Sequence, residues 1–219
     1  SRIPAELDVF KRLSDILIAL VGLILASPVM LITAILVKAT SHGPVFYRQT
    51  RVTRGGKEFN ILKFRSMSAS AEKESGPMLA TSHDPRVTPV GKYLRSLRID
   101  ELPQLFNVLV GDMSMVGPRP ERPFFVEQFE QQNPHYHLRH SVRAGLTGYA
   151  QVYGKYASDF SAKLNFDLIY IKQYSLLMDV KILIQTVKIL FDKVSSRGVE
   201  DDEAPTDQVR LPEGVKHLS

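Results

Sequence analysis

The adjacent carboxylates of Asp100 and Glu101 are the residues of this sequence whose types are best suited to chemistry. An apolar stretch of helical character, "LPQLFNVLVG", follows them, and the turn "GPRP" comes shortly after it, at 117–120. Most acid pairs of this kind lie at solvated helix starts, where the positive end of the helix dipole favours carboxylates. A carboxylate can also attack phosphorus and form an acyl phosphate, and a neighbouring one can help to hold a divalent cation.

Basic residues near the acid pair favour this second alternative. Arg95 and Arg98 precede the pair, and Arg119 stands between Pro118 and Pro120 in the GPRP turn. A guanidinium can bind two phosphate oxygens at once, and the two prolines would hold it stiffly. Cations that gather with carboxylates indicate a phosphorylated substrate bridged by a divalent metal ion.

Four more polar residues are candidates for the same site: Lys63, Arg65, Arg143 and Gln151. Lys63 and Arg65 belong to "KFRSM", where a solvated strand edge is the alternative interpretation. Gln151 could contact a sugar or uracil, and packing is its alternative role.

Composition limits the classes of protein to consider. The chain has 219 residues, of which 44% are hydrophobic, enough for one compact domain or one domain with a membrane appendage. The net charge of +5 suits nucleic acid, an anionic membrane or a phosphorylated substrate. We see no RNA-binding or zinc-finger pattern and therefore expect no nucleic-acid partner. The absence of cysteine excludes disulfides, thiolate metal sites and a cysteine nucleophile.

An uncharged apolar stretch, "ILIALVGLILASPVMLITAILV" at 16–37, is long enough to cross a bilayer at about 1.5 Å per residue. Pro28 at its centre should bend the helix, and the hydroxyl of Ser27 can satisfy a freed carbonyl. Positive residues mark the cytoplasmic side of a membrane helix. Here they occur on both flanks: Lys11, Arg12, Lys38, Arg48, Arg51, Arg54 and Lys57. The pattern favours equally a helix–break–helix hairpin on one face and a kinked span.

The remaining patterns predict an α+β, mainly helical fold. Residues 44–64 alternate apolar and polar side chains around Gly55-Gly56, as in a two-stranded hairpin. Residues 66–86 form a polar connection or a short helix, and helices are expected within 87–111, 121–137 and 162–173. Residues 175–194 are amphipathic, which suits either a core-facing helix or a helix lying in the membrane interface.

Several stretches together resemble the bacterial sugar transferases, the monotopic phosphoglycosyl transferases, over about residues 11–198. They are the apolar stretch with its flanks, "KFRSM", "RIDELPQLFNVLVGDMSMVGPRPE" and "RHSVRAGLTGYAQV". The stretch "SGPMLATSHDPRVTPVGKYLRS" is similar to the hexose-1-phosphate transferases that begin exopolysaccharide and O-antigen synthesis. Those often carry a separate N-terminal membrane region, so we expect this chain to be the catalytic C-terminal part of a longer protein. Ala144 and Tyr149 stand where the family usually has Pro and Trp.

The resemblance implies a reaction and a role for each residue. A UDP-sugar, usually a hexose such as glucose or galactose, would donate its sugar-phosphate to polyprenyl (undecaprenyl) phosphate and release UMP. Asp100 would be the nucleophile and carry a covalent phosphosugar, Glu101 would be its partner, and both would hold Mg²⁺. Arg119 matches the nucleotide-site arginine, and Arg95 and Arg143 match positions that contact phosphate.

The resemblance also implies how the chain is organised. Residues 1–198 would form the catalytic domain and 199–219 a polar C-terminal tail. Ser27 and Pro28 match the family's helix break, which makes about 11–40 a re-entrant membrane hairpin helix. A small β-hairpin and amphipathic interfacial helices would surround a cytosolic active site at the bacterial inner membrane. Membrane lipid is an expected partner, and a homodimer is compatible with the resemblance.

Two other functions are left open by the residues themselves. A glycosidase could use an Asp and a Glu as acid and nucleophile, but adjacent residues rarely place carboxyls about 5 Å or more apart across a sugar. The other is a membrane-tethered binding or scaffold module that senses a nucleotide sugar without catalysis, which ligand binding without UMP release would favour.

Overall fold

The computed structural model describes residues 4–68, 85–154 and 159–196. Within these ranges the chain is mainly helical, with two small two-stranded sheets. In chain order the elements are α1 (Ala5–Thr40), β1 (Phe46–Val52), η1 (Arg54–Gly56), β2 (Glu58–Phe64), α3 (Pro89–Ser96), η2 (Ile99–Glu101), α4 (Gln104–Val110), β3 (Met113–Val116), α5 (Pro123–Gln132), η3 (Tyr136–Ser141), β4 (Ala144–Thr147), α6 (Tyr149–Tyr153), α7 (Phe160–Lys172) and α8 (Leu176–Ser196). The η elements are single 3₁₀ turns or short 3₁₀ helices. The polar segment predicted at 66–86 and the tail at 199–219 lie largely or wholly outside the described residues.

The predicted β-hairpin is confirmed. Strands β1 and β2 pair antiparallel, with Phe46 opposite Phe64 and Val52 opposite Glu58. Gly55 and Gly56 in the connection have φ angles of 72° and 74°, which glycine adopts without steric cost. The second sheet, a parallel pair of β3 and β4, was not predicted. Parallel pairing brings together segments about 30 residues apart, a contact that periodicity along the chain cannot reveal.

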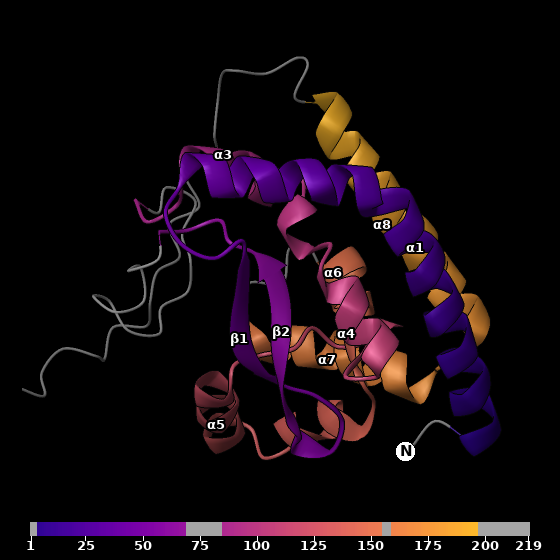
Figure 1. The fold of residues 1–219 in the computed structure, drawn as a ribbon. Helices are drawn as coiled ribbons and strands as arrows, with labels where there is room; N and C mark the ends of the chain where they lie inside the picture. The colour runs from indigo at the N-terminus through magenta and orange to yellow at the C-terminus, as the bar shows by residue number, and fades with distance from the viewer. Residues whose placement is uncertain (1–3, 69–84, 155–158, 197–219) are drawn as a thin grey trace, which may run out of the picture.

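Helix α1 is one continuous helix that bends near its middle (Figure 1). Pro28 lies in its interior, and the hydroxyl of Ser27 donates to the carbonyl of Ile24 at 2.7 Å. Ile24 is four residues before Pro28, so its carbonyl is the one that the missing proline N–H leaves unpaired. The predicted bend and its hydroxyl partner are therefore present. The two halves form one bent helix, and its re-entrant arrangement in a membrane stays a prediction.

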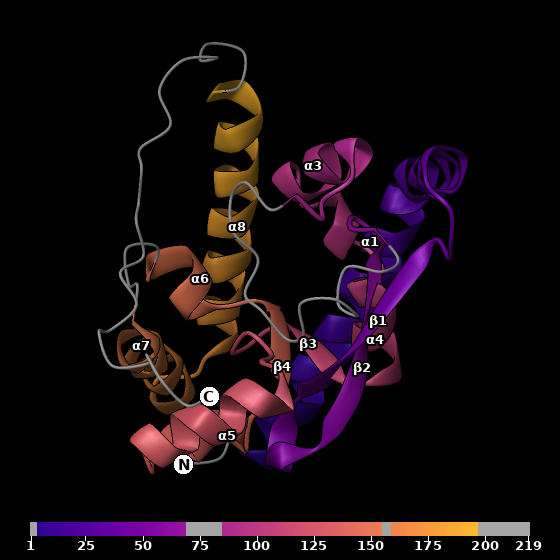
Figure 2. The same ribbon diagram turned by 90° about the vertical axis from the view of Figure 1, so that its left-hand side faces the viewer.

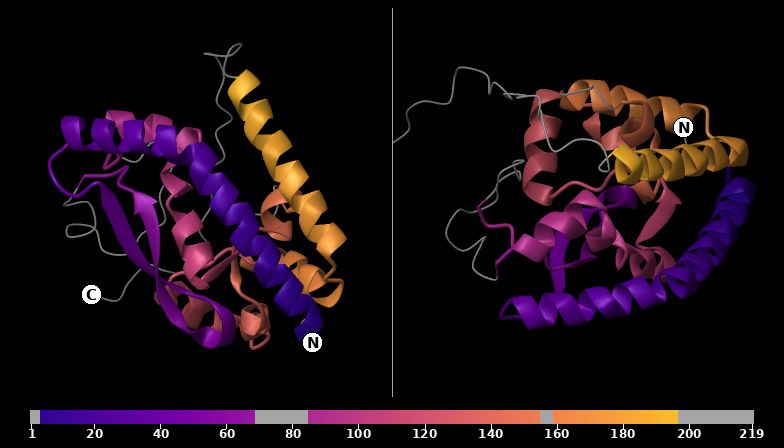
Figure 3. Two further views of the ribbon diagram at one scale, coloured as in Figure 1. Left: turned by 45° about the vertical axis from the view of Figure 1, so that its right-hand side comes forward. Right: turned by 90° about the horizontal axis from the view of Figure 1, so that it is seen from above.

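Helix α1 is long and apolar enough to cross a membrane by length and composition, within the described part of the chain. Only 11% of its apolar window is buried against the rest of the protein. The helix arches over α4 and the β1–β2 hairpin (Figures 1 and 3). Its buried stripe recurs every three to four residues and includes Lys11, Asp15, Ala19, Thr33 and Val37. The opposite side leaves many large apolar side chains exposed.

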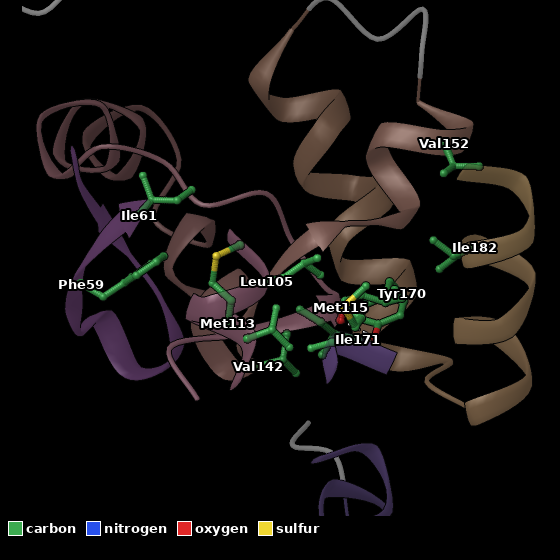
Figure 4. Packing of buried hydrophobic residues seen from close by; sticks show 13 residues of the cluster. Phe59, Ile61, Leu105, Met113, Met115, Val142, Val152, Tyr170, Ile171 and Ile182 are labelled. Carbon is green, nitrogen blue, oxygen red and sulfur yellow. Dashed lines mark hydrogen bonds between the residues drawn. The ribbon is translucent and has the colours of Figure 1, made fainter. Parts of the chain in front are cut away.

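The main hydrophobic core joins both sheets to the helices that flank them. Figure 4 shows side chains from β2, α4, β3, α7 and α8 meeting in one cluster. Val108, Met113 and Ile182 within it are fully buried. Strands β3 and β4 lie between the β1–β2 hairpin on one side and α6, α7 and α8 on the other (Figure 2). The core therefore fixes the short segments that follow α3 and β3.

Buried polar contacts join helix α8 to α1. Lys11 on α1 and Asp179 on α8 form an ion pair at 2.7 Å, and the hydroxyl of Tyr170 donates to the other oxygen of Asp179 at 2.8 Å. The first turn of α8 lies near α1, and towards its C-terminal end α8 diverges from α1 (Figure 2). Its Ile182 side faces the core, while Leu177, Ile184, Val187 and Phe191 are among its exposed apolar residues. The helix thus combines both predicted characters, a core-facing side and an exposed apolar side.

Candidate active site

The acid pair lies in η2, a single 3₁₀ turn between α3 and α4. We expected it at the start of a regular helix, and the 87–111 segment is instead two helices separated by this turn. Arg98 begins the turn with a φ of 59°, the left-handed region that a non-glycine residue enters at a cost of about 1–2 kcal/mol. Pro103 directly precedes α4, and because proline has no backbone N–H it cannot donate a helical hydrogen bond to the preceding turn. Asp100 and Glu101 are each 8% exposed.

Three cations surround Glu101. Lys63 Nζ and Arg119 Nη2 lie 3.4 Å and 3.0 Å from its Oε1, and Arg98 Nη1 lies 3.1 Å from its Oε2. Burial by itself would raise the pKa of Glu101, but Arg119, Lys63 and Arg98 together outweigh burial and hold this pKa well below its usual 4.5. Glu101 is therefore ionised and fixed by its partners at physiological pH.

Asp100 is in the opposite situation. Within the described part of the chain, no hydrogen bond or ion pair reaches its carboxylate. Burial, and then the neighbouring charge of Glu101, raise its pKa from 3.8 to about 6, although Lys63, Arg95 and Arg98 act against the rise. Two adjacent carboxylates thus have pKa values moved in opposite directions by their surroundings, a feature of sites where two acids take different roles. Asp100 is mostly ionised at neutral pH, with its oxygens open to a ligand.

Lys63 reaches the site from β2. Burial lowers the pKa of Lys63, and the charge of Glu101 partly restores it. Arg119 comes from the loop after β3, and its pKa is raised, mainly by Glu101. Cations from three separate segments, β2, η2 and this loop, therefore converge on one carboxylate.

Strand β4 contacts the GPRP turn through its glycine. Gly145 donates its N–H to the carbonyl of Pro118 at 2.9 Å. A Cβ on Gly145 would lie 2.1 Å from the backbone nitrogen of Gly117, so a larger residue could not pack here without moving the turn. Pro120 accepts a hydrogen bond from Arg51 Nη1 at 3.1 Å. Pro118 and Pro120 thus shape the turn, and substrate contact by either of them stays a prediction.

Other predicted residues lie away from the acid pair. Arg143 pairs with Asp8 near the start of α1, at 3.3 Å. Arg65 is buried and donates to the carbonyls of Pro44 and Ser41, at 2.6 Å and 3.0 Å, which joins the end of β2 to the end of α1. Gln151 lies on α6, and its buried Oε1 has no hydrogen-bond partner among the described residues. Substrate contact by these residues stays a prediction.

Arg95 and Arg98 complete the surroundings of the pair. Arg95 lies in the last turn of α3 and is one of the cations that act on the pKa of Asp100. Arg98 was noted as a nearby cation but was not among the predicted site residues. The sequence signal that could have placed it is its spacing of three residues from Glu101, the separation at which side chains meet on a helical turn.

The two carboxylates differ in how well they suit a magnesium ion. Mg²⁺ sites commonly use one or two carboxylates together with substrate phosphates and water. Asp100 has both oxygens available, which fits this chemistry. Both oxygens of Glu101 are engaged by cations, which would repel a metal ion. Among the described residues, no group of three or more His, Cys, Asp or Glu side chains is arranged to hold a metal ion.

Comparisons with known proteins give one matching family and several relatives. The family model described as "Bacterial sugar transferase" matches residues 7–193. The chain is 47% identical over 201 residues to the UDP-N-acetylgalactosamine-undecaprenyl-phosphate N-acetylgalactosaminephosphotransferase of Aeromonas hydrophila, a match that covers 90% of this chain and 47% of that protein. It is 46% identical over 184 residues to the UDP-glucose:undecaprenyl-phosphate glucose-1-phosphate transferase of Klebsiella pneumoniae, covering 82% of this chain and 39% of that protein.

A third relative is shorter. An exopolysaccharide production protein of Rhizobium leguminosarum bv. phaseoli is 40% identical over 187 residues, and the match covers 82% of this chain and 94% of that protein. The chain thus spans less than half the length of the first two relatives and nearly all of the third.

Proposed function

Because the chain belongs to the bacterial sugar transferase family, we propose that it transfers a sugar-1-phosphate from a UDP-sugar to undecaprenyl phosphate and releases UMP. The observation that carries the proposal is the unequal state of the two carboxylates. Asp100 has a raised pKa and no ion-pair partner among the described residues, while Glu101 gathers three cations beside it.

The charges of the site match a diphosphate. Lys63, Arg95, Arg98 and Arg119 act on the pKa of one or both carboxylates, so four cations face two anions. Two positive charges are left over, which would balance the two negative charges of the diphosphate bridge in a UDP-sugar. Arginine binds phosphate oxygens in pairs, and Arg119 sits in a supported turn suited to such a contact. Arg95 and Arg143 stay predicted phosphate contacts, the latter after leaving Asp8.

We propose that the reaction proceeds in two displacements at one phosphorus. A carboxylate oxygen of Asp100 attacks the sugar-bearing phosphorus, and the bond from that phosphorus to the oxygen of UMP breaks, with the electron pair leaving on UMP. The phosphosugar is then held on Asp100 as an acyl phosphate. An oxygen of undecaprenyl phosphate attacks the same phosphorus and the carboxylate leaves. A pKa of about 6 makes Asp100 more basic than an ordinary aspartate while leaving it mostly ionised at pH 7.

Glu101 has a different task in this scheme. It holds Lys63, Arg98 and Arg119 in place before the diphosphate arrives, so the site does not need to reorganise around its substrate. Mg²⁺ is the proposed cofactor and would neutralise charge on the diphosphate. Both carboxylates were predicted to hold it, and Asp100 is the one whose oxygens are available.

We propose that the protein lies on the cytoplasmic face of the bacterial inner membrane, with α1 re-entering the side from which it came. The support is the central bend of α1, the positive residues on both of its flanks, and its exposed apolar side. Exposed apolar residues of α8 would lie in the same interface. This arrangement would bring a polar site close to the depth of a lipid phosphate.

Two classes of donor sugar are compatible with the sequence and the relatives, a hexose and an N-acetylhexosamine. Glucose or galactose is predicted from the sequence, and the names of the relatives mention glucose and N-acetylgalactosamine. We therefore propose a donor panel of UDP-glucose, UDP-galactose and UDP-N-acetylgalactosamine.

The test is to incubate the protein in nanodiscs with each donor and Mg²⁺, without a lipid acceptor, and to measure the intact mass and the UMP formed. An added sugar-phosphate with equimolar UMP, lost in Asp100→Asn, is the expected result. Asp159→Asn is the matched control, since Asp159 lies at the start of α7 and makes no side-chain cap bond. UMP release that requires undecaprenyl phosphate and leaves no adduct would refute the covalent route. Donor binding without any UMP release would refute catalysis and favour the alternative of a nucleotide-sugar-binding module.

A further inference from the structure

We propose that Arg139, itself held by Asp167, is a positioning residue that fixes the GPRP turn and thereby sets the guanidinium of Arg119 opposite Glu101. The inference rests on the proposed function for the role of Arg119 in binding a diphosphate. It assigns a task in that function to a buried ion pair that touches neither carboxylate of the acid pair.

The GPRP turn has few backbone N–H groups and several backbone carbonyls. Pro118 and Pro120 have no backbone N–H, so the turn can donate few hydrogen bonds of its own. It is held mainly through its carbonyls. The carbonyls of residues 118, 119 and 120 accept, in order, from Gly145 N at 2.9 Å, Arg139 Nη2 at 2.8 Å and Arg51 Nη1 at 3.1 Å. The bond to the middle carbonyl belongs to Arg119 itself and depends on one distant side chain.

The guanidinium of Arg139 is fixed from several directions. Its Nε and Nη2 lie 3.0 Å and 2.9 Å from Oδ2 of Asp167 on α7, and its Nη1 donates to the hydroxyl of Tyr136 at 2.6 Å. Arg139 is 5% exposed and Asp167 is 3% exposed. All three nitrogens of the planar group are engaged, so its orientation relative to the turn is set by α7 and η3.

A pure contribution to folding is the alternative explanation for such a pair. Burying two charges costs several kcal/mol in general, and apolar residues of similar volume often replace a buried ion pair without loss of stability. The contact to the Arg119 carbonyl is what distinguishes this pair from the buried pair of Lys11 and Asp179. That second pair, at 2.7 Å, joins α1 to α8, and neither of its residues donates to the carbonyls of residues 118, 119 and 120. It therefore serves as the control.

A double-mutant cycle separates the two explanations. We would measure UMP release against donor concentration for Arg139→Lys, Arg119→Ala, both together, and the original protein. Lysine keeps the charge beside Asp167 but cannot reproduce the planar three-nitrogen contact. If Arg139 acts through Arg119, Arg139→Lys should lower kcat/KM by about tenfold or more alone. It should lower it by less than about twofold when Arg119 is already alanine.

The control variant should behave differently from Arg139→Lys, and one result would overturn the inference. Asp179→Asn should change kcat/KM by the same factor in both backgrounds, because its effect is not transmitted through the turn. Equal factors for Arg139→Lys in both backgrounds would overturn the inference. Should Arg139→Lys fail to fold, Tyr136→Phe removes one partner of the guanidinium and keeps the ring, and its smaller loss should likewise vanish in Arg119→Ala.

Failure of the proposed function gives a different experimental result from failure of the positioning role of Arg139. If no donor of the panel is turned over by the original protein, the proposed reaction falls, and the same four proteins are compared for binding of inorganic pyrophosphate by calorimetry. Coupled losses of affinity would still support the positioning role. Additive losses, or no pyrophosphate binding by the original protein, would overturn it.

Discussion

Asp100→Asn is expected to stabilise the folded protein at pH 8 while abolishing sugar-phosphate transfer. The carboxylate of Asp100 is buried and lies beside the ionised Glu101, so its charged form is disfavoured in the folded state. Asparagine has nearly the same shape and no charge. The substitution therefore removes a cost that the native site accepts for the sake of its reactivity.

The direction and size of the expected change in folding stability follow from the pKa of Asp100 in the folded protein and its ordinary value. The pKa of Asp100 is about 6 in the folded protein and 3.8 ordinarily, so the folded state binds the proton more tightly. The stability that this proton contributes is complete below pH 3.8 and is lost as the pH rises through 6. At about 1.4 kcal/mol per pH unit, the ionised carboxylate costs about 3 kcal/mol at pH 8 and about 1 kcal/mol at pH 4.5.

The assay is thermal unfolding of both proteins in nanodiscs, without Mg²⁺, at pH 8 and pH 4.5. For a chain of this size 1 kcal/mol corresponds to about 2–4 °C in Tm, so Asp100→Asn should unfold several degrees higher at pH 8, by a margin that shrinks at pH 4.5. An advantage of Asp100→Asn that is equal at both pH values, or absent at pH 8, would refute the assignment of a raised pKa to Asp100.

Three other outcomes are expected. Glu101→Gln should destabilise the protein by about 1–3 kcal/mol at pH 8, because three cations lose their common partner, and the loss should shrink as the pH falls below 4.5, seen by thermal unfolding. Asp179→Asn should lower stability by about 3–5 kcal/mol in the same assay, since the cost of leaving the buried Lys11 unpaired outweighs the burial that raises the pKa of Asp179. Pro28→Ala should straighten α1, and spin labels at Phe10 and Ile35 should then move towards the separation of about 37 Å expected for a straight helix.

Each of these outcomes has a result that contradicts it. Stabilisation by Glu101→Gln at pH 8 would mean that its cations prefer other partners. A loss under about 1 kcal/mol for Asp179→Asn would mean that the pair is solvated. An unchanged label separation in Pro28→Ala would assign the bend to packing against α4 and not to the proline; the absence of native cysteine makes this labelling specific.

Local patterns predicted the parts of the fold that depend on nearby residues. The hairpin around Gly55 and Gly56 and the bend at Pro28 follow from backbone geometry, which each residue carries with it. The hydroxyl bond of Ser27 follows for the same reason. The parallel pairing of β3 with β4 could not be predicted in this way, because it joins two segments that meet only once the core has formed.

For the candidate site, too, the sequence predicted some features and the tertiary structure decided others. Residue types and their order in the chain, at Asp100–Glu101 and in the GPRP turn, were enough to indicate phosphate chemistry and two adjacent acids. Their unequal roles were not contained in the pattern, since either carboxylate could have received the cations. The left-handed backbone at Arg98 ends α3 and places the pair in a turn. There Glu101 meets Lys63 and Arg119, and Asp100 pairs with none of the described cations.

The sequence by itself determined which groups are available: two acids, the arginine between two prolines, and an apolar helix with a central break in its hydrogen bonding. Tertiary structure alone decided which of these groups meet. Arg65 and Arg143 had the same claim to the site as Lys63, yet packing directs them to the carbonyls at the end of α1 and to Asp8. The physical reason is that charge and burial act over a few ångströms of space, whatever the distance along the chain.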